Sequence, residues 1–156
     1  MAANWCYSEP WPTAANNSIV SYPNIPKPGF FAVKNACRPV LASARFSKYQ
    51  WMEGETFFTD IWMLNDFYKE LPSGRVTIKI LGDGVPVTLL SWEYNNLKAN
   101  INQAGPTVRF NLPAWKTDRF KILLEVEGHP EYNSDYTLAY KSRSFGGRKG
   151  TPTMNQ

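Results

Sequence analysis

Thr56 to Asn65 reads T-F-F-T-D-I-W-M-L-N, the longest run of β-branched, aromatic and aliphatic residues in the chain. Turn residues stand at both of its ends, Glu53-Gly54-Glu55 before it and Asn65-Asp66 after it, as is typical of strand boundaries. Large apolar residues occupy both parities: Phe57, Ile61 and Met63 on one, and Phe58, Trp62 and Leu64 on the other. We therefore predict a central strand that needs cover on both faces, one by a sandwich core and the other by a neighbouring segment or by a surface that this chain does not supply.

Alternating apolar and polar residues extend on both sides of this stretch, from Pro39 to about residue 141. In 75–81, for example, Val76, Ile78 and Ile80 alternate with polar residues, and Gly82-Asp83-Gly84 turns the chain into the next strand. The pattern predicts an immunoglobulin-like antiparallel β-sandwich of about seven strands. The predicted strands are 40–46, 56–65, 75–81, 85–94, 108–112, 120–126 and 136–140.

The rest of the chain divides at Pro39. We predict that residues 1–38 form an extended arm and one short helix, from about Gly29 to Cys37 with Pro28 in its first turn, and that 39–142 form the sandwich. Residues 143–156 are rich in Gly and polar side chains, and we expect a flexible tail there.

The composition excludes several classes of function. The chain has 156 residues, 43% hydrophobic and 15% aromatic, which is enough for one core. Its net charge of +4 is scattered along the strands, so we expect no nucleic-acid interface. No run is long enough to span a membrane and no signal peptide is recognisable, so we expect no membrane partner and leave the compartment open.

Cysteine and histidine are too few for the usual metal or hydrolytic sites. Cys6 and Cys37 are predicted to be free and largely buried thiols, and His129 to be an ordinary exposed loop residue. We accordingly predict no metal site and no cofactor.

The order of segments in the first half of the chain resembles the end of a glycoside hydrolase family 2 enzyme, the family of β-galactosidase, β-glucuronidase and β-mannosidase. The matching pieces are Trp5 with Glu9, Trp11-Pro12, Pro26-Lys27-Pro28 through Lys34, and Glu53-Gly54-Glu55-Thr56-Phe57 through Asn65-Asp66. In that family the chain leaves the last strand of a (β/α)8 barrel, passes through a helix and enters a C-terminal sandwich.

The resemblance implies that residues 1–38 are the end of the last barrel strand, a loop and the connecting helix, and that the sandwich packs on the catalytic barrel. It implies a parent that is a retaining glycosidase acting on a glycan, whose two catalytic glutamates lie on barrel strands that this chain lacks. A periplasmic or extracellular location is compatible with such a parent. The chain itself is then expected to be inactive. Its uncovered surface is also a place where two copies of the chain could associate. Trp5, Glu9 and Trp11 are the residues expected near the sugar.

A second class of function remains open from the residues alone. Aromatic side chains at or near predicted loops could form a stacking platform for sugar rings and make the domain a carbohydrate-binding module. The candidates are Trp51, Trp92, Tyr94 and Trp115. The sugar specificity of the parent and the oligomeric state are not encoded in any motif of this chain.

Overall fold

The computed structural model describes residues 6–13 and 17–143. The chain divides into two compact units, Met1–Arg38 and Pro39–Gln156. No helix in the described part of the chain is long and apolar enough to cross a membrane.

The first unit is a small hairpin followed by one helix. Strands β1 (Val20–Ser21) and β2 (Ile25–Pro26) pair in antiparallel register, and Ser8 forms a bridge with Val20. Helix α1 (Pro28–Ala36) begins with proline, whose fixed φ suits the first helical position. The predicted helix is therefore present, one residue earlier than expected, and none of its residues is buried.

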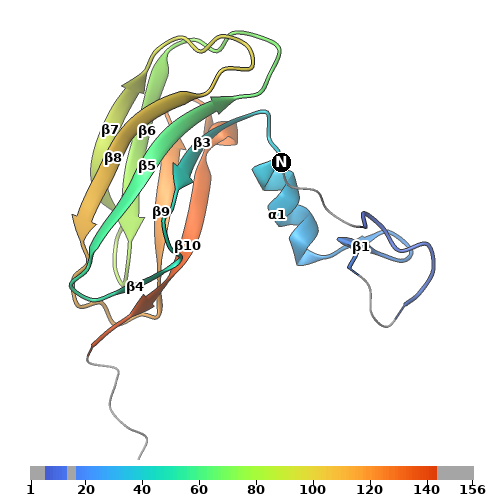
Figure 1. Cartoon of the computed structure of the whole chain (residues 1–156), viewed down its shortest axis with the longest axis horizontal. Helices are drawn as coiled ribbons and strands as arrows, with labels where there is room; N and C mark the ends of the chain where they lie inside the picture. Colours follow the sequence, from blue (N-terminus) through green and yellow to red (C-terminus); the bar gives the residue numbers. More distant parts are fainter. Residues whose placement is uncertain (1–5, 14–16, 144–156) are drawn as a thin grey trace, which may run out of the picture. The chain divides into compact units, whose positions relative to one another are not determined.

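The second unit is a sandwich of two sheets, as Figure 1 shows. One sheet has three strands in the order β3-β5-β8, and the other has five in the order β4-β10-β9-β6-β7. A short 3-10 turn, η1 (Pro130–Tyr132), precedes the last strand. The strands are β3 (Val40–Arg45), β4 (Gln50–Met52), β5 (Thr56–Asn65), β6 (Gly74–Leu81), β7 (Val87–Tyr94), β8 (Gln103–Asn111), β9 (Arg119–Val126) and β10 (Ser134–Lys141).

The predicted fold class is confirmed, with one difference in detail. Strand β4 was not among the predicted strands, and it pairs with β10 in parallel, with Trp51 opposite Tyr140. Three residues are too few to show an alternating pattern, and their partners in β10 lie 89 residues further along the chain. The chain thus passes from the three-stranded sheet at β3 to the edge of the five-stranded sheet at β4.

The core lies between the inward faces of the two sheets. Strand β5 lies at the centre of its sheet, and its odd-numbered residues point inward, including Phe57, Ile61 and Met63, none of which is exposed. The facing sheet contributes the alternating residues of β6 and β9, together with the end of β10. The fully or nearly buried residues from those strands are Val76, Ile78, Ile80, Phe120, Ile122, Leu124, Leu138 and Tyr140.

Candidate functional site

Glu9 is the centre of a polar cluster in the first unit. Its side chain is only 6% exposed and pairs with the Lys27 ammonium at 2.8 Å. The Ser18 hydroxyl donates to the same carboxylate at 3.1 Å, and the backbone N–H of Tyr22 donates at 3.2 Å. The Lys27 contact is the main reason that the pKa of Glu9 lies below its usual value. The predicted extended arm is therefore held in place at Glu9, because the cluster ties it to the hairpin.

The Glu9 cluster makes the first unit sensitive to acid. A carboxyl whose pKa is lowered by folding stabilises the fold above its unfolded pKa, and this contribution is lost as the pH falls through the folded pKa. We predict that Glu9→Gln lowers the hydrogen-exchange protection of the Val20 amide at pH 7, where that amide bonds to the carbonyl of Tyr7 at 3.0 Å. The wild-type protection factor should also fall as the pH drops below 4.5, the usual carboxyl value, more steeply than in the variant. Equal protection in the two proteins at pH 7 would show that Glu9 does not hold the hairpin.

The structure describes only one of the other two residues predicted near the sugar. Trp11 is 63% exposed, and Trp5 lies outside the described residues. The two cysteines are free, but the prediction that they are largely buried is wrong: Cys6 is partly exposed and Cys37 is exposed, since it follows directly on a helix that buries no residue. His129 lies in the loop as predicted, stacked on Tyr132 with ring centroids 4.8 Å apart.

The residues proposed as a sugar-stacking platform do not form one. Trp51 and Tyr94 are each 2% exposed and belong to the core, so this part of the prediction is wrong. Trp92 and Trp115 are partly buried against the same core. Gly105 and Gly82 lie so close to these two rings that a Cβ at either glycine would collide with the indole. Trp51, Trp92 and Tyr94 point inward because the strand register, which the sequence does not show, sets their direction. Trp115 lies in the connection between β8 and β9, where its ring packs against Phe120 and Tyr140.

Three glutamates near turns hold local structure. The Glu53 carboxylate accepts bonds from the Ser142 hydroxyl at 2.8 Å and the Arg143 N–H at 2.9 Å. Glu55 accepts from Lys48 at 2.8 Å and from the N–H of Met52 at 2.9 Å. These bonds lower the pKa of both carboxyls, as His129 does for Glu131. A general acid of a glycosidase needs the opposite shift.

The outer face of the five-stranded sheet is polar and charge-paired. Arg75 lies between Glu93 at 2.9 Å and Glu127 at 3.5 Å, and Lys79 pairs with Glu125 at 2.6 Å. These exposed pairs contribute little to stability, but they make the outer face of this sheet polar and readily solvated.

The outer face of the three-stranded sheet is different. Along β5 the outward side chains include Phe58, Trp62 and Leu64, and Leu64 pairs in register with Leu41 of β3. Two arginines flank this apolar row. Arg109 lies over the Phe58 ring at 5.5 Å, and Arg45 is in register with Asp60, which is exposed and accepts a bond from Thr107 at 2.6 Å. The predicted two-sided apolar strand is thus present, with one side in the core and the other on the surface of the sandwich.

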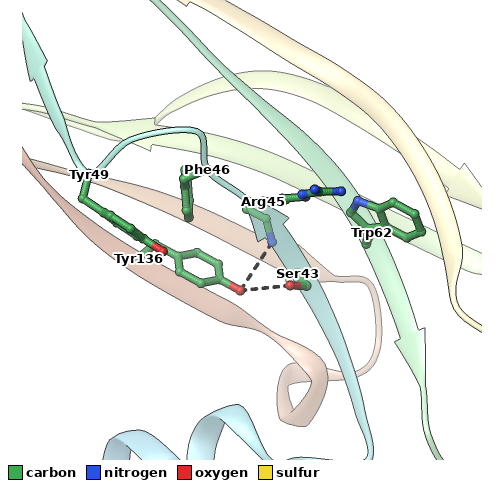
Figure 2. Close-up of a pocket in the computed structure, with 7 residues that line it drawn as sticks. Ser43, Arg45, Phe46, Tyr49, Trp62 and Tyr136 are labelled. Atoms are coloured by element: carbon green, nitrogen blue, oxygen red, sulfur yellow. Dashed lines mark hydrogen bonds between the residues drawn. The ribbon is translucent and has the colours of Figure 1, made fainter. Parts of the chain in front are cut away.

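An open pocket of about 470 Å³ lies beside this face, where the free edge of β3 meets β10 (Figure 2). Its aromatic walls come from Phe46 and Tyr49 after β3, Trp62 of β5 and Tyr136 of β10. The hydroxyl of Tyr136 lies 3.4 Å from both the Ser43 hydroxyl and the Ala44 backbone N–H, which it caps at the free strand edge. The remaining lining comes from Ser43, Ala44 and Arg45 of β3.

The sequence did not single out this pocket as a site. Tyr49 and Tyr136 are 87 residues apart, and they line one pocket because β3 and β10 lie at one of the places where the two sheets approach each other. The only local signal is F-S-K-Y at 46–49, two aromatic residues in a short connection between strands.

Fold and site together describe an immunoglobulin-like β-sandwich that carries one apolar outer face and an aromatic pocket at its edge. The sequence matches no family model, and no curated protein matches it. Among solved structures, the chain is similar to a β-D-mannosidase from Dictyoglomus thermophilum, with a TM-score of 0.59 and 17% identity. That likeness covers 86% of this chain but only 16% of the mannosidase, so the chain spans a small part of that enzyme's length.

Two further solved structures are similar at lower scores. A CARDB domain from Pyrococcus furiosus gives a TM-score of 0.49 at 11% identity, over 66% of this chain and 91% of that one. A superoxide reductase from Ignicoccus hospitalis gives 0.44 at 10% identity, over 64% and 80%. Neither carries an argument about function, and the likeness to the mannosidase shows a shared fold.

Proposed function

We propose that this chain is the non-catalytic C-terminal accessory part of a retaining glycoside hydrolase of the family 2 type. In this role the sandwich packs against the catalytic barrel through the outer face of the β3-β5-β8 sheet. The glycan is bound and cleaved by the parent enzyme, and the isolated chain has no hydrolase activity of its own.

The contrast between the two outer faces carries the proposal. A sheet face that meets water normally presents polar residues, as the paired charges around Arg75 and Lys79 do. Large apolar side chains gathered on a surface, as Phe58, Trp62 and Leu64 are on either side of Asp60, are typical of an interaction site. The likeness to part of a β-mannosidase supports a glycosidase as the protein that provides the partner surface.

The first unit fits the same proposal as the end of the last barrel strand, a loop and the connecting helix, residues 1–38. Trp11 is largely exposed, and α1 leaves Phe31 and Val33 exposed as well. Side chains of this kind would pack when the rest of a barrel is present. We propose Trp5, Glu9 and Trp11 as residues near the parent's sugar site, with Glu9 holding the local backbone through Lys27 and Ser18.

A single substitution on the outer face tests the docking. Trp62 is only partly buried, so Trp62→Ala should change the free energy of unfolding by about 1 kcal/mol or less. The same change should sharply reduce co-purification of the tagged chain with the separately expressed catalytic barrel of its own enzyme. Thr77→Ala, on the outer face of the other sheet, is the matched control and should leave co-purification unchanged.

Two results would contradict the proposal. One is a chain that is not retained by the barrel under any condition in which both are folded. The other is retention that survives Trp62→Ala and Phe58→Ala together. Hydrolysis of nitrophenyl glycosides by the isolated chain would contradict its non-catalytic role.

A further inference from the structure

We propose that the pocket between β3 and β10 is a carbohydrate-binding site for an oligosaccharide built of pyranose rings. This inference rests on the proposed function for the class of ligand, and on the pocket itself for the residues. The site is separate from the platform expected from the sequence, and it shares none of the residues of that platform.

The aromatic side chains of the pocket form a packed and partly exposed platform. Phe46 is at the centre, with its ring centroid 5.1 Å from that of Tyr136 and 6.3 Å from that of Tyr49. Phe46 also packs on the core through Phe57 at 6.3 Å, which fixes the group to the sandwich. Tyr49 is 73% exposed, so its ring is available to a ligand. A tyrosine held in this way can offer an apolar ring face and a polar hydroxyl at once.

The polar groups of the pocket are donors and hydroxyls. Figure 2 shows Ser43 between the tyrosines and Trp62, with the Arg45 side chain directed toward Trp62. In the described part of the chain, the Arg45 guanidinium has no hydrogen-bond or ion-pair partner. The backbone carbonyl of the same residue accepts from the Thr59 hydroxyl at 3.0 Å. The cations of the opposite sheet, Arg75 and Lys79, are by contrast neutralised by glutamates. Arg45 therefore keeps several N–H donors for a ligand.

This combination matches the surface of a sugar better than that of other ligands. A pyranose has an apolar face of C–H groups, which packs on an aromatic ring, and a rim of hydroxyls, which bond to guanidinium and hydroxyl groups. A pocket of about 470 Å³ is in the usual range for small-ligand sites, which are mostly apolar with a few convergent polar groups. A simple anion would find one guanidinium and no second cation among the residues that line the pocket.

The sugar could be charged or neutral, and Arg45 is the pocket residue whose contacts would differ between the two. A uronic acid would place a carboxylate on the guanidinium, with two parallel N–H···O bonds. A neutral sugar would use the same donors for hydroxyl oxygens, with less energy. Mannohexaose and hexagalacturonate are the two probes that separate these cases.

The experiment is calorimetric titration of the 156-residue chain with each probe. Binding of one or both is expected, and Tyr49→Ala should weaken it by about tenfold, equivalent to ~1.4 kcal/mol. Tyr68→Ala is the matched control, because Tyr68 is 71% exposed and does not line the pocket, and it should leave the affinity within about twofold. Arg45→Gln should weaken hexagalacturonate more than mannohexaose if the carboxylate is recognised.

The outcomes separate this inference from the proposed function. Absence of binding to both probes overturns the pocket, and so does binding that Tyr49→Ala leaves unchanged, while retention of the chain by the barrel is measured independently. A chain that binds sugar at Tyr49 but is not retained by a barrel would leave the pocket in place and overturn the docking.

Discussion

Replacing Trp51 with alanine should lower the free energy of unfolding of the sandwich by about 3–5 kcal/mol, the usual cost of deleting a buried indole. Trp51 is 2% exposed, and its ring packs against Phe57 with centroids 5.0 Å apart. The indole N–H donates to the carbonyl of Lys48 at 3.2 Å, and the Lys48 ammonium lies 4.3 Å from the ring centroid. The substitution therefore leaves a cavity and also removes the polar contacts around it.

Trp51 also anchors strand β4, so its loss should affect more than the cavity that it leaves. The strand has three residues and pairs with β10 alone, so it has few backbone bonds to keep it in place. The buried ring is its main attachment to the core. Losing it should free the edge of the five-stranded sheet, where Tyr140 of β10 is the register neighbour of Trp51.

Urea unfolding followed by circular dichroism measures this effect. Tyr68→Ala, which removes an exposed ring from the same unit, should shift the unfolding free energy by about 0.5 kcal/mol or less. A loss below about 1 kcal/mol for Trp51→Ala would contradict the burial of the ring. It would also return Trp51 to the candidates for sugar stacking.

The predictability of the fold differs from that of the site for a physical reason. Strands such as β6 and β9 alternate because one face is dry and the other wet, so local sequence is enough to locate them. The apolar residues on both faces of β5 likewise predicted its central place and a second apolar row, Phe58, Trp62 and Leu64, outside the core. The direction of Trp51 depends on pairing with a distant strand, and the sequence alone assigned it to the surface.

The pocket depends even more than Trp51 on contacts between residues that are distant in the sequence. Its walls come from β3, β5, β10 and the connection after β3, and no spacing in the sequence joins Tyr49 to Tyr136. The sequence located β3, β5 and β10 closely, but a site at the junction of two sheets is a property of their packing.

A second large effect is expected at the end of β5, where Asn65 is completely buried. Its side-chain amide donates to the carbonyls of Lys69 at 3.0 Å, Leu97 at 3.3 Å and Lys98 at 3.0 Å. Its side-chain oxygen accepts from the N–H of Phe67 at 3.2 Å. One side chain thus ties together backbone groups of two separate connections, one around Phe67 and Lys69 and the other at Leu97 and Lys98. Breaking hydrogen bonds at a completely buried side chain is costly, because the partners lose the bond and the new group gains none.

Asn65→Asp keeps the shape of the side chain but replaces the NH2 donor with a carboxylate oxygen, which is an acceptor. The new carboxylate would place an acceptor oxygen against the three carbonyl oxygens of Lys69, Leu97 and Lys98, on a side chain that is completely buried. We expect a loss of about 3–5 kcal/mol in unfolding free energy at pH 7, as for other uncompensated buried charges.

The loss should depend on pH with a defined sign. Burial and the facing carbonyls raise the pKa of the new carboxyl above its unfolded value of about 3.9. Because the folded state then holds its proton more tightly, the penalty is smallest at acid pH and grows as the pH rises through the interval between the two pKa values. The difference from wild type, measured by urea unfolding at pH 4 and pH 7, should therefore be smaller at pH 4.

Asn102→Asp provides the matched control for this charge. Asn102 is exposed and its side-chain oxygen accepts the backbone N–H of Asn65 at 3.1 Å, a bond that a carboxylate keeps. That variant should stay within about 0.5 kcal/mol of wild type at both pH values, since the same charge is added where water can reach it. If the two variants lose equal stability, added charge rather than the buried amide is the cause, and the role assigned to Asn65 is wrong.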